Sequence, residues 1–264
     1  MLEPNVNLTQ GPVRQAPMIP RRTALLLVDV QQGFDDPRWG IRNNPEAESR
    51  MAELLQAWRD RGLPVIHIQH CSTDPDSPLR PDLPGAALKE ATGPRPEELV
   101  IQKRVNSAFI QTPLEAHLER QDISALVVVG LTTDHCVSTT VRMAGNLGFT
   151  VFLVSDATAT FDRGGVDGHW YSAEAIHQIH LASLHGEFCT VLSCSDLLAG
   201  LEGGSEPLLP PGSSPRRGSD FQAGASPLHR MKGPSFGPER RQGQEPAPPS
   251  PRGFNTAPFA KELP

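Results

Sequence analysis

Two stretches of almost uninterrupted apolar residues, residues 23–30 and residues 126–129, constrain the fold more than any other feature of the sequence. Both are short and rich in Leu and Val, as buried strands are. A strand with one face in water alternates apolar and polar residues, whereas a strand covered on both faces is apolar throughout. The two stretches therefore predict central strands of a parallel sheet that has helices on both faces.

Further strands and helices alternate along residues 21–199. Apolar runs at residues 64–70, 99–101, 150–154 and 188–192 predict four more strands. Helical periodicity predicts a helix through Met51 and Trp58, one beginning at Thr112, one following Cys136, and one over residues 172–184. We expect Asn43 or Asn44 to cap the first helix. Six strands alternating with helices predict an α/β, three-layer sandwich of the Rossmann-like kind, with a mainly parallel sheet.

The composition at the two ends differs from that of the centre. Residues 1–20 contain Pro12, Pro17 and Pro20 and are expected to form a loose arm. Residues 200–264 are rich in Pro and Gly, with 13 Pro and 9 Gly from residue 201 onward, and lack apolar periodicity. Such a segment buries too little apolar surface to offset its ordering entropy. We expect a disordered tail, with docking of partner proteins as the alternative.

Charge and cysteine content exclude several classes of partner. The formal net charge is −6, which argues against nucleic acid and anionic membranes as partners. No apolar stretch approaches the roughly 18 residues of a membrane span, and the N-terminus lacks the layout of a secretion signal. The four cysteines are few and irregularly spaced, so a disulfide framework is not expected. These features predict a cytoplasmic protein.

Three polar residues follow predicted strands: Asp29, Lys103 and Cys136. All carboxyl ends of a parallel sheet lie at one edge, so residues more than 100 positions apart can meet there. Each has a simpler interpretation, because Asp is common in turns, Lys is common at the surface, and a lone buried Cys is usually inert. Their joint placement favours a catalytic group.

The chemistry of the three residues is coherent. Cys136 would attack a carbonyl carbon, and Asp29 would take the thiol proton and return it to the leaving nitrogen. Lys103 would hold Asp29 as a carboxylate. Because Cys136 lies where a helix begins, we expect unpaired N–H groups and the helix dipole to favour its thiolate. The N–H groups between Leu131 and Cys136 would stabilise the oxyanion.

The motifs around these residues resemble the isochorismatase-like cysteine hydrolases over residues 21 to about 199. The matching segments are residues 27–34, Lys103 with residues 106–109, and residues 130–137. The resemblance implies a parallel α/β fold, a catalytic triad of Asp29, Lys103 and Cys136, and a homo-oligomer. It also implies a cis peptide bond between Leu131 and Thr132, in a turn that forms the oxyanion hole with Cys136.

Within this family, the amino-acid sequences of several loops are similar to those of the subgroup that includes streptothricin hydrolase, an amidase. True isochorismatases lack the nucleophilic cysteine, so Cys136 argues against that activity. Nicotinamidases carry an Asp-x-His that binds a metal, and no such motif follows residue 67. His67 and His70 point to opposite faces of a strand, although His70 could face the pocket. We therefore expect no metal and no cofactor.

The leading hypothesis is a metal-independent cysteine hydrolase that cleaves a C–N bond of a small amide, lactam or carbamoyl compound through a thioester. Two alternatives are a nicotinamidase and a catalytically inactive scaffold domain whose tail docks partner proteins. The long connection at residues 71–98 is expected to cover the site. The candidate pocket residues come from loops after strand ends: Gln31, Phe34, Trp39, Asn106, Phe109, His135 and Phe161. Each aromatic could instead belong to the core.

Overall fold

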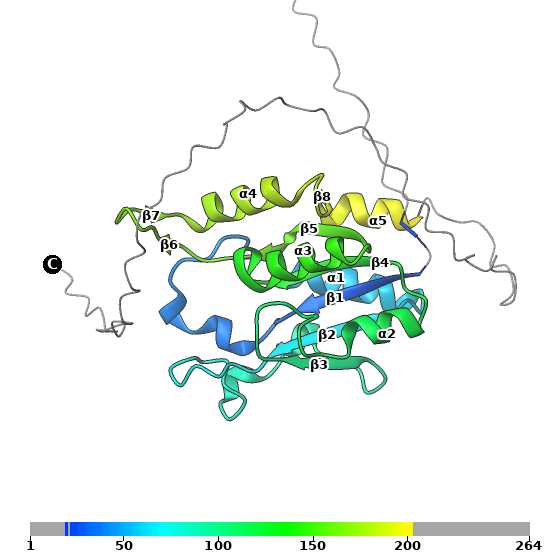
Figure 1. Ribbon diagram of the computed structural model, residues 1–264, viewed down its shortest axis with the longest axis horizontal. Helices are drawn as coiled ribbons and strands as arrows, with labels where there is room; N and C mark the ends of the chain where they lie inside the picture. The colour runs from blue at the N-terminus through cyan, green and yellow to red at the C-terminus, as the bar shows by residue number, and fades with distance from the viewer. Residues whose placement is uncertain (1–18, 21, 203–264) are drawn as a thin grey trace, which may run out of the picture. The chain divides into compact units, whose positions relative to one another are not determined.

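The computed structural model describes residues 19–20 and 22–202, all within the unit Met1–Leu208. Its centre is a six-stranded sheet in the order β3-β2-β1-β4-β5-β8 (Figure 1), in which every neighbouring pair is parallel. The strands are β1 (Thr23–Val28), β2 (Val65–His70), β3 (Leu99–Lys103), β4 (Ala125–Leu131), β5 (Thr150–Ala159) and β8 (Thr190–Leu192). The predicted parallel α/β fold is confirmed.

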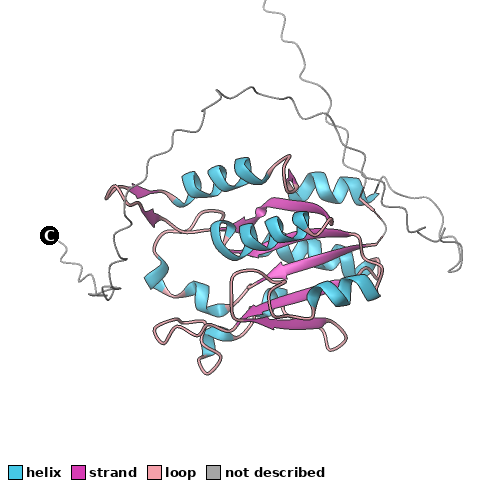
Figure 2. Ribbon diagram, in the orientation of Figure 1, coloured by secondary structure: helices cyan, strands magenta, loops and turns pink. Residues whose placement is uncertain are grey.

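Helices cover both faces of this sheet (Figure 2). Helices α1 (Ala47–Asp60) and α5 (Cys194–Glu202) bury Met51, Trp58 and Leu197 in the core on one face. Helices α2 (Leu114–Arg120), α3 (Ser138–Asn146) and α4 (Ala173–Leu184) supply the core on the other face. Because β1 and β4 contribute buried residues to both cores, their uninterrupted apolar runs are explained.

The order of the strands reverses between β1 and β4. The chain adds β2 and then β3 on one side of β1, and it continues with β4, β5 and β8 on the other side. The loops that leave β1 and β4 therefore diverge, which opens a crevice at the carboxyl ends of these strands. In open α/β sheets, ligands bind at such a switch point.

The long connection between β2 and β3 is fastened to the loop after β1. It contains two short 3-10 turns, η3 (Pro84–Ala86) and η4 (Glu90–Thr92). Two backbone hydrogen bonds of 2.9 Å join the segments, from Gln32 N to Ala87 O and from Lys89 N to Val30 O. A Cβ on Gly33 would lie 2.9 Å from the carbonyl oxygen of Gly85. The connection thus forms a closely packed wall beside the crevice.

Several elements differ from the sequence prediction. Strand β5 extends to Ala159 rather than ending at residue 154, and α5 continues past the expected domain boundary at residue 199. A short antiparallel pair, β6 (Arg163–Gly164) and β7 (Trp170–Tyr171), was also not expected. The side chains of Asn43 and Asn44, which were predicted to cap α1, instead form hydrogen bonds with the backbone of β5 and the residue after it. The side chain of Asn43 accepts from Thr160 N, and that of Asn44 donates to the carbonyls of Ser155 and Thr158.

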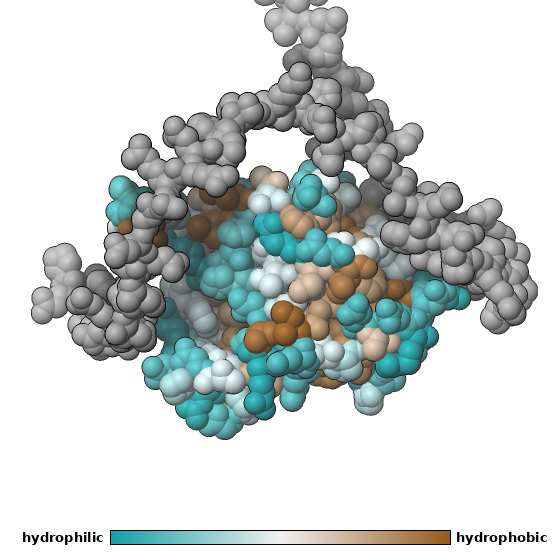
Figure 3. Space-filling model, in the orientation of Figure 1, coloured by the Kyte–Doolittle hydropathy of each residue, from teal (hydrophilic) through white to brown (hydrophobic). Residues whose placement is uncertain are grey.

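The visible surface mixes hydrophilic and hydrophobic residues, with the hydrophobic ones in small groups (Figure 3). Exposed apolar side chains include Val100 on β3 and Val105 and Ile110 in the segment after it. Among the described residues, no helix has the length and apolar character needed to cross a membrane. The predicted arm lies outside the described residues apart from residues 19 and 20, and so does the predicted tail from residue 203 onward.

Candidate active site

Four neighbouring strands deliver one polar side chain each to the crevice: Asp29 after β1, His70 at the end of β2, Lys103 at the end of β3, and Cys136 after β4. The ammonium nitrogen of Lys103 lies 2.6 Å from Oδ2 of Asp29, 3.0 Å from Nδ1 of His70 and 3.2 Å from Sγ of Cys136. The structure therefore brings together the three residues that the sequence predicted, and it adds His70 to them.

Asp29 is fully buried and has a left-handed backbone, with a φ of 53°. This conformation turns the chain away from the sheet immediately after β1 and directs the carboxyl group toward Lys103. Oδ1 has no hydrogen-bond partner among the described residues. Burial raises the pKa of the Asp29 carboxyl group, and the positive charge of Lys103 opposes that rise. A carboxylate with one free oxygen and a raised pKa is suited to accept a proton.

Cys136 lies in η5 (Thr133–Val137), a π-helical turn that leads directly into α3. The peptide bond between Leu131 and Thr132 is cis, as the family resemblance implied. Burial and the neighbouring Asp29 carboxylate raise the pKa of the Cys136 thiol. Burial and the Asp29 carboxylate thus act against the resting thiolate that was expected at the start of this helix. At rest the thiol keeps its proton.

Gln31 braces the strand end that carries His70 and does not line the pocket. It is fully buried, and its amide nitrogen donates to the carbonyls of His70 (3.0 Å) and Ala86 (2.8 Å). Its amide oxygen accepts from the backbone N–H of His70 at 2.8 Å. Gln31 was predicted to line the pocket, but it is not in the lining of the cavity at Cys136, and these three bonds use its amide group for the scaffold.

A cavity of about 210 Å³ opens onto Cys136. It is lined by Phe34, Trp39, His70, Ser72, Asp74, Ser77, Leu79, Asn106, Thr132, His135, Cys136 and Arg163. Four predicted pocket residues are in this lining: Phe34, Trp39, Asn106 and His135. The rings of Phe34 and Trp39 pack with centroids 5.4 Å apart and form an apolar wall.

Three other predicted site residues lie outside the lining. Phe161 stacks behind Trp39 at 5.8 Å, and Phe109 packs against Phe149 at 5.9 Å in the core. The side chain of Leu131 is fully buried in the core on the α1 face. Thr132 does line the cavity, and its buried hydroxyl has no partner among the described residues. Aromatic residues after strand ends were equally compatible with core and pocket, so sequence could not separate them.

Arg163 lines the cavity and was not expected there. It follows β5, and its guanidinium forms an ion pair with Asp134 of η5, with Nε 2.7 Å from Oδ2. Hydrogen bonds from Arg163 and from the Thr160 hydroxyl, together with the charges of His135 and Arg163, overcome the effect of burial and lower the pKa of Asp134 to about 2. The pair ties the turn that carries Cys136 to the segment after β5. Asp134 therefore orients this turn.

A second support reaches the same turn from α4. Nδ1 of His177 lies 2.9 Å from the hydroxyl oxygen of Thr133, and His177 is buried. Burial lowers the pKa of His177, so its ring is neutral and can accept from the Thr133 hydroxyl. The nucleophile turn is thus held from two sides by Arg163 and His177.

The position between the polar side chains is filled by a positive charge of the protein. Asp29, His70 and Cys136 each place a metal-type ligand atom within 4.8 Å of the others. The Lys103 ammonium is in hydrogen-bond contact with all three, so it occupies the place that a cation would take. The geometry supplies electrostatic stabilisation through Lys103.

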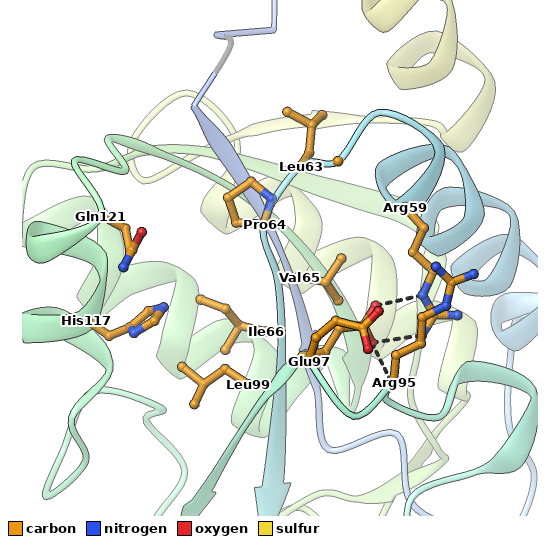
Figure 4. A pocket seen from close by; sticks show the side chains of 12 residues that line it. Arg59, Leu63, Pro64, Val65, Ile66, Arg95, Glu97, Leu99, His117 and Gln121 are labelled. Carbon is orange, nitrogen blue, oxygen red and sulfur yellow. Dashed lines mark hydrogen bonds and ion pairs between the residues drawn. The ribbon is translucent and has the colours of Figure 1, made fainter. Parts of the chain in front are cut away.

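A larger cavity, of about 420 Å³, lies at the opposite ends of the strands, where β2 and β3 begin. Figure 4 shows Arg59 and Arg95 on one side of it and His117 and Gln121 on the other. Arg59 forms two hydrogen bonds to the carboxylate of Glu98, at 2.7 and 2.8 Å. This carboxylate also accepts from His67. His67 is thus a packed structural residue.

Fold and site together define a parallel α/β protein whose buried cysteine meets a carboxyl group and an ammonium group at the topological switch point. The family model of the Isochorismatase domain matches residues 23–195. The chain belongs to the isochorismatase family and has the α/β fold of solved structures of that family.

The similarity to individual proteins extends over the described region. The isochorismatase family protein YrdC of Bacillus subtilis is 49% identical over 177 residues, which are 67% of this chain and 95% of YrdC. A crystal structure of an isochorismatase family protein from Chromobacterium violaceum is 52% identical, with a TM-score of 0.67, and covers 69% of this chain and 94% of that one. A cysteine hydrolase from Pseudomonas syringae is 25% identical, with a TM-score of 0.65, and covers 75% and 100%.

Two relatives with named activities are also similar to this chain. Streptothricin hydrolase of Streptomyces noursei is 35% identical over 139 residues, which are 53% of this chain and 50% of that protein. Nicotinamidase 3 of Arabidopsis thaliana is 28% identical over 200 residues, which are 68% of this chain and 89% of that protein.

Proposed function

We propose that this protein is a metal-independent cysteine hydrolase that cleaves a C–N bond of a small amide, lactam or carbamoyl compound. The contact of one ammonium group with both Asp29 and Cys136, at 2.6 and 3.2 Å on a cavity wall, carries this proposal. It places a nucleophile, a proton acceptor and a positive charge around one point. The names of the relatives streptothricin hydrolase and nicotinamidase support the amide class.

In the first half of the reaction, the thiol proton of Cys136 moves to the Asp29 carboxylate as sulfur attacks the carbonyl carbon. A C–S bond forms, and the carbonyl oxygen becomes an oxyanion. Lys103 and the backbone N–H groups of the turn at Thr132 and Cys136 stabilise the developing charge. When the C–N bond breaks, Asp29 returns the proton to the leaving nitrogen, which gives a neutral amine or ammonia and a thioester.

In the second half, water adds to the thioester carbonyl while Asp29 accepts one of its protons. The C–S bond then breaks, the proton returns to the sulfur, and a carboxylic acid leaves. Asp29 thus carries one proton in each half and is restored at the end. Lys103 keeps its charge throughout, so no external cation is required for this sequence of steps.

The cavity favours small substrates. Its volume of about 210 Å³ is below the roughly 300–1,000 Å³ of sites for drug-sized ligands. Phe34 and Trp39 offer an apolar wall, whereas His135 and Arg163 lie on the polar side. These features support a compact substrate with an apolar face and a polar group.

The test is turnover of a panel of small amides, lactams, carbamoyl compounds and nicotinamide by the wild type, Cys136→Ala and Cys189→Ala. Cys189 is a matched control because its buried thiol lies near Leu184 O, away from the crevice. We expect the wild type and Cys189→Ala to hydrolyse at least one compound, with and without EDTA, and Cys136→Ala to hydrolyse none. Activity confined to nicotinamide and abolished by EDTA would favour a nicotinamidase, and no turnover would favour a silent scaffold.

We also propose a homo-oligomer in the cytoplasm. The exposed side chains of Val100, Val105 and Ile110 near the edge strand β3 support an interface between copies. All four cysteines are free thiols, which fits a reducing compartment. Light scattering during size-exclusion chromatography should give a mass above the 28.6 kDa of one chain.

A further inference from the structure

The ammonium group of Lys103 has as many acceptors as it has protons. A lysine ammonium carries three N–H bonds and no acceptor. Its partners are Oδ2 of Asp29, Nδ1 of His70 and Sγ of Cys136. Since Lys103 can only donate, the ring nitrogen of His70 that faces it must be the acceptor.

This contact fixes the proton on the other ring nitrogen. In a neutral imidazole one nitrogen accepts and the other carries the hydrogen. With Nδ1 accepting from Lys103, the hydrogen lies on Nε2, which becomes a donor. Burial and the charge of Lys103 lower the pKa of His70 to about 4, which keeps the ring neutral at physiological pH.

The backbone that carries the ring is held in place, and the ring faces the cavity. The backbone N–H and C=O of His70 are both bound by the side chain of Gln31. His70 lines the cavity beside Cys136, and Nε2 has no hydrogen-bond partner among the described residues. Nε2 is not among the fully buried polar atoms without partners, so solvent in the cavity can reach it.

We propose that His70 is a substrate-binding residue that Lys103 locks as the Nε2–H tautomer, so that it donates a hydrogen bond to an acceptor atom of the substrate. The substrate class narrows to small amides with a second acceptor, such as a carbonyl, carboxylate or ring nitrogen. This inference rests on the proposed function for the nature of the substrate. The tautomer itself depends only on the contact between Lys103 and His70.

The first experiment measures the tautomer in the full chain without any substrate. Long-range ¹H–¹⁵N NMR of protein labelled with ¹⁵N-histidine distinguishes a bare ring nitrogen from one that carries hydrogen. The His70 signals are assigned by their loss in His70→Asn. We expect a bare Nδ1 and a protonated Nε2 that do not titrate between pH 5.5 and 8. An Nδ1–H tautomer, or titration near the ordinary value of 6.5, would overturn the proposal.

The second experiment uses the best amide substrate from the panel and compares His70→Leu, His70→Asn and a control, His117→Leu. Leu cannot bond to Lys103 or to substrate, whereas Asn offers an oxygen to Lys103 and an amide N–H to the cavity. His117 lies on α2 beside the larger cavity at the opposite edge. We expect His70→Leu to lower kcat/KM by about 10-fold, which is the loss of one hydrogen bond, and Asn to restore part of it.

Circular dichroism and thermal melting show whether each variant is folded before the rates are compared. A folded His70→Leu with kcat/KM within 2-fold of wild type would overturn the substrate contact. Equal loss in His70→Leu and His70→Asn would also overturn it, because it would reflect the general effect of altering the ring. No turnover on the whole panel would instead overturn the proposed function, and with it the substrate contact, while the tautomer is decided by NMR.

Discussion

The site contains two opposite charges, on the Asp29 carboxylate and the Lys103 ammonium. It also contains one proton for which the Cys136 sulfur and the Asp29 carboxylate compete. The resting thiol keeps the proton because burial and the Asp29 carboxylate raise the pKa of Cys136. The raised pKa of Asp29 makes this carboxyl group a competitive acceptor for the same proton. The three groups therefore titrate as a unit, and activity profiles will report the unit rather than one residue.

Removing the carboxylate should affect thiol reactivity and turnover in opposite directions. In Asp29→Asn the negative charge beside Cys136 is lost while Lys103 stays, so the pKa of the thiol falls. We expect faster alkylation of Cys136 by iodoacetamide at pH 7 and loss of amide hydrolysis. The rate is measured by mass spectrometry of the Cys136 peptide.

Asp74→Asn is the matched control for this experiment, because Asp74 lines the cavity but is not among the groups that shift the pKa of Cys136. It should leave the alkylation rate within 2-fold of wild type. Slower alkylation in Asp29→Asn than in wild type would show that Asp29 activates the resting thiol, contrary to the charge argument.

Loss of Lys103 should cost stability as well as activity. Both side chains of the Lys103–Asp29 pair are fully buried, so Lys103→Met leaves a carboxyl group without its cation. Breaking one partner of a buried pair costs about 3–5 kcal/mol. We expect a decrease of this size in the free energy of unfolding by urea at pH 7.

Adding Asp29→Asn to Lys103→Met should recover part of the lost stability, because the unpaired carboxylate is removed with its partner. A double variant that is less stable than Lys103→Met by the full cost of Asp29→Asn would mean that the two side chains contribute independently.

At the level of elements, the seam between β1 and β4 positions both Asp29 and Cys136. Val28, which directly precedes Asp29, pairs with Gly130, the residue before the Leu131–Thr132 cis peptide that leads to the Cys136 turn; Gly130 has a φ of 125°. A Cβ on Gly130 would lie 2.1 Å from the carbonyl oxygen of Val28. The two strands approach this closely only because position 130 has no side chain.

Gly130→Ala should therefore be severely destabilising, by at least about 3 kcal/mol, since it combines a backbone clash with an unfavourable φ. Gly148→Ala is a control with a positive φ of 87° and open space around it, and we expect a cost of about 1 kcal/mol. Urea unfolding of both variants measures the difference. Equal costs at the two positions would contradict the close-packing argument.

Sequence predicted the strands and helices that are defined by local patterns. Ser172 caps α4 by accepting from Ala175 N, and Gly148 follows the last turn of α3; both are residue types that local rules favour at helix ends. Asn43 and Asn44 were predicted as caps because cap preference is a local rule, but the backbone of β5 offers them better partners. Strand β5 was predicted too short because Ser155 and Asp156 interrupt its apolar run.

The polar centre of the site was predictable because strand ends converge at one edge whatever the details of the loops. The pocket was not, because which loop residues face a cavity depends on packing between segments far apart in sequence. Arg163 lines the cavity and pairs with Asp134, 29 positions away in the sequence, so no local pattern indicates this contact. The raised pKa of Cys136 was also missed, since sequence reveals a helix start but not the depth of burial.

At the level of the whole molecule, the two ends of the parallel strands have different roles. The carboxyl ends of the strands carry the cavity with Cys136. At the amino ends of the strands, the Glu98 carboxylate contacts Arg59 of α1 and His67 of β2. Hydrogen bonds from Arg59, Arg95 N and His67 overcome the effect of burial and lower the pKa of Glu98 to about 2. This network holds helix and sheet together far from the crevice.

Glu98→Gln should thus reduce stability by about 1–3 kcal/mol at pH 7 without changing kcat/KM. Because the folded pKa of Glu98 is depressed from 4.5 to about 2, its contribution is complete above pH 4.5 and is lost as the pH falls toward 2. The difference between wild type and variant should shrink over this range in urea unfolding. Exposed Glu97→Gln is the control, and a constant difference down to pH 2 would contradict the assignment.

The four polar side chains of the site come from four adjacent strands, β3, β2, β1 and β4, one from each. A slip of one residue in any strand would turn its side chain to the opposite face. The site therefore requires all four strands to pair in register, because a chain in which β3 is frayed or mispaired lacks the ammonium group that contacts Asp29, His70 and Cys136. Completion of the sheet and completion of the site are thus a single event.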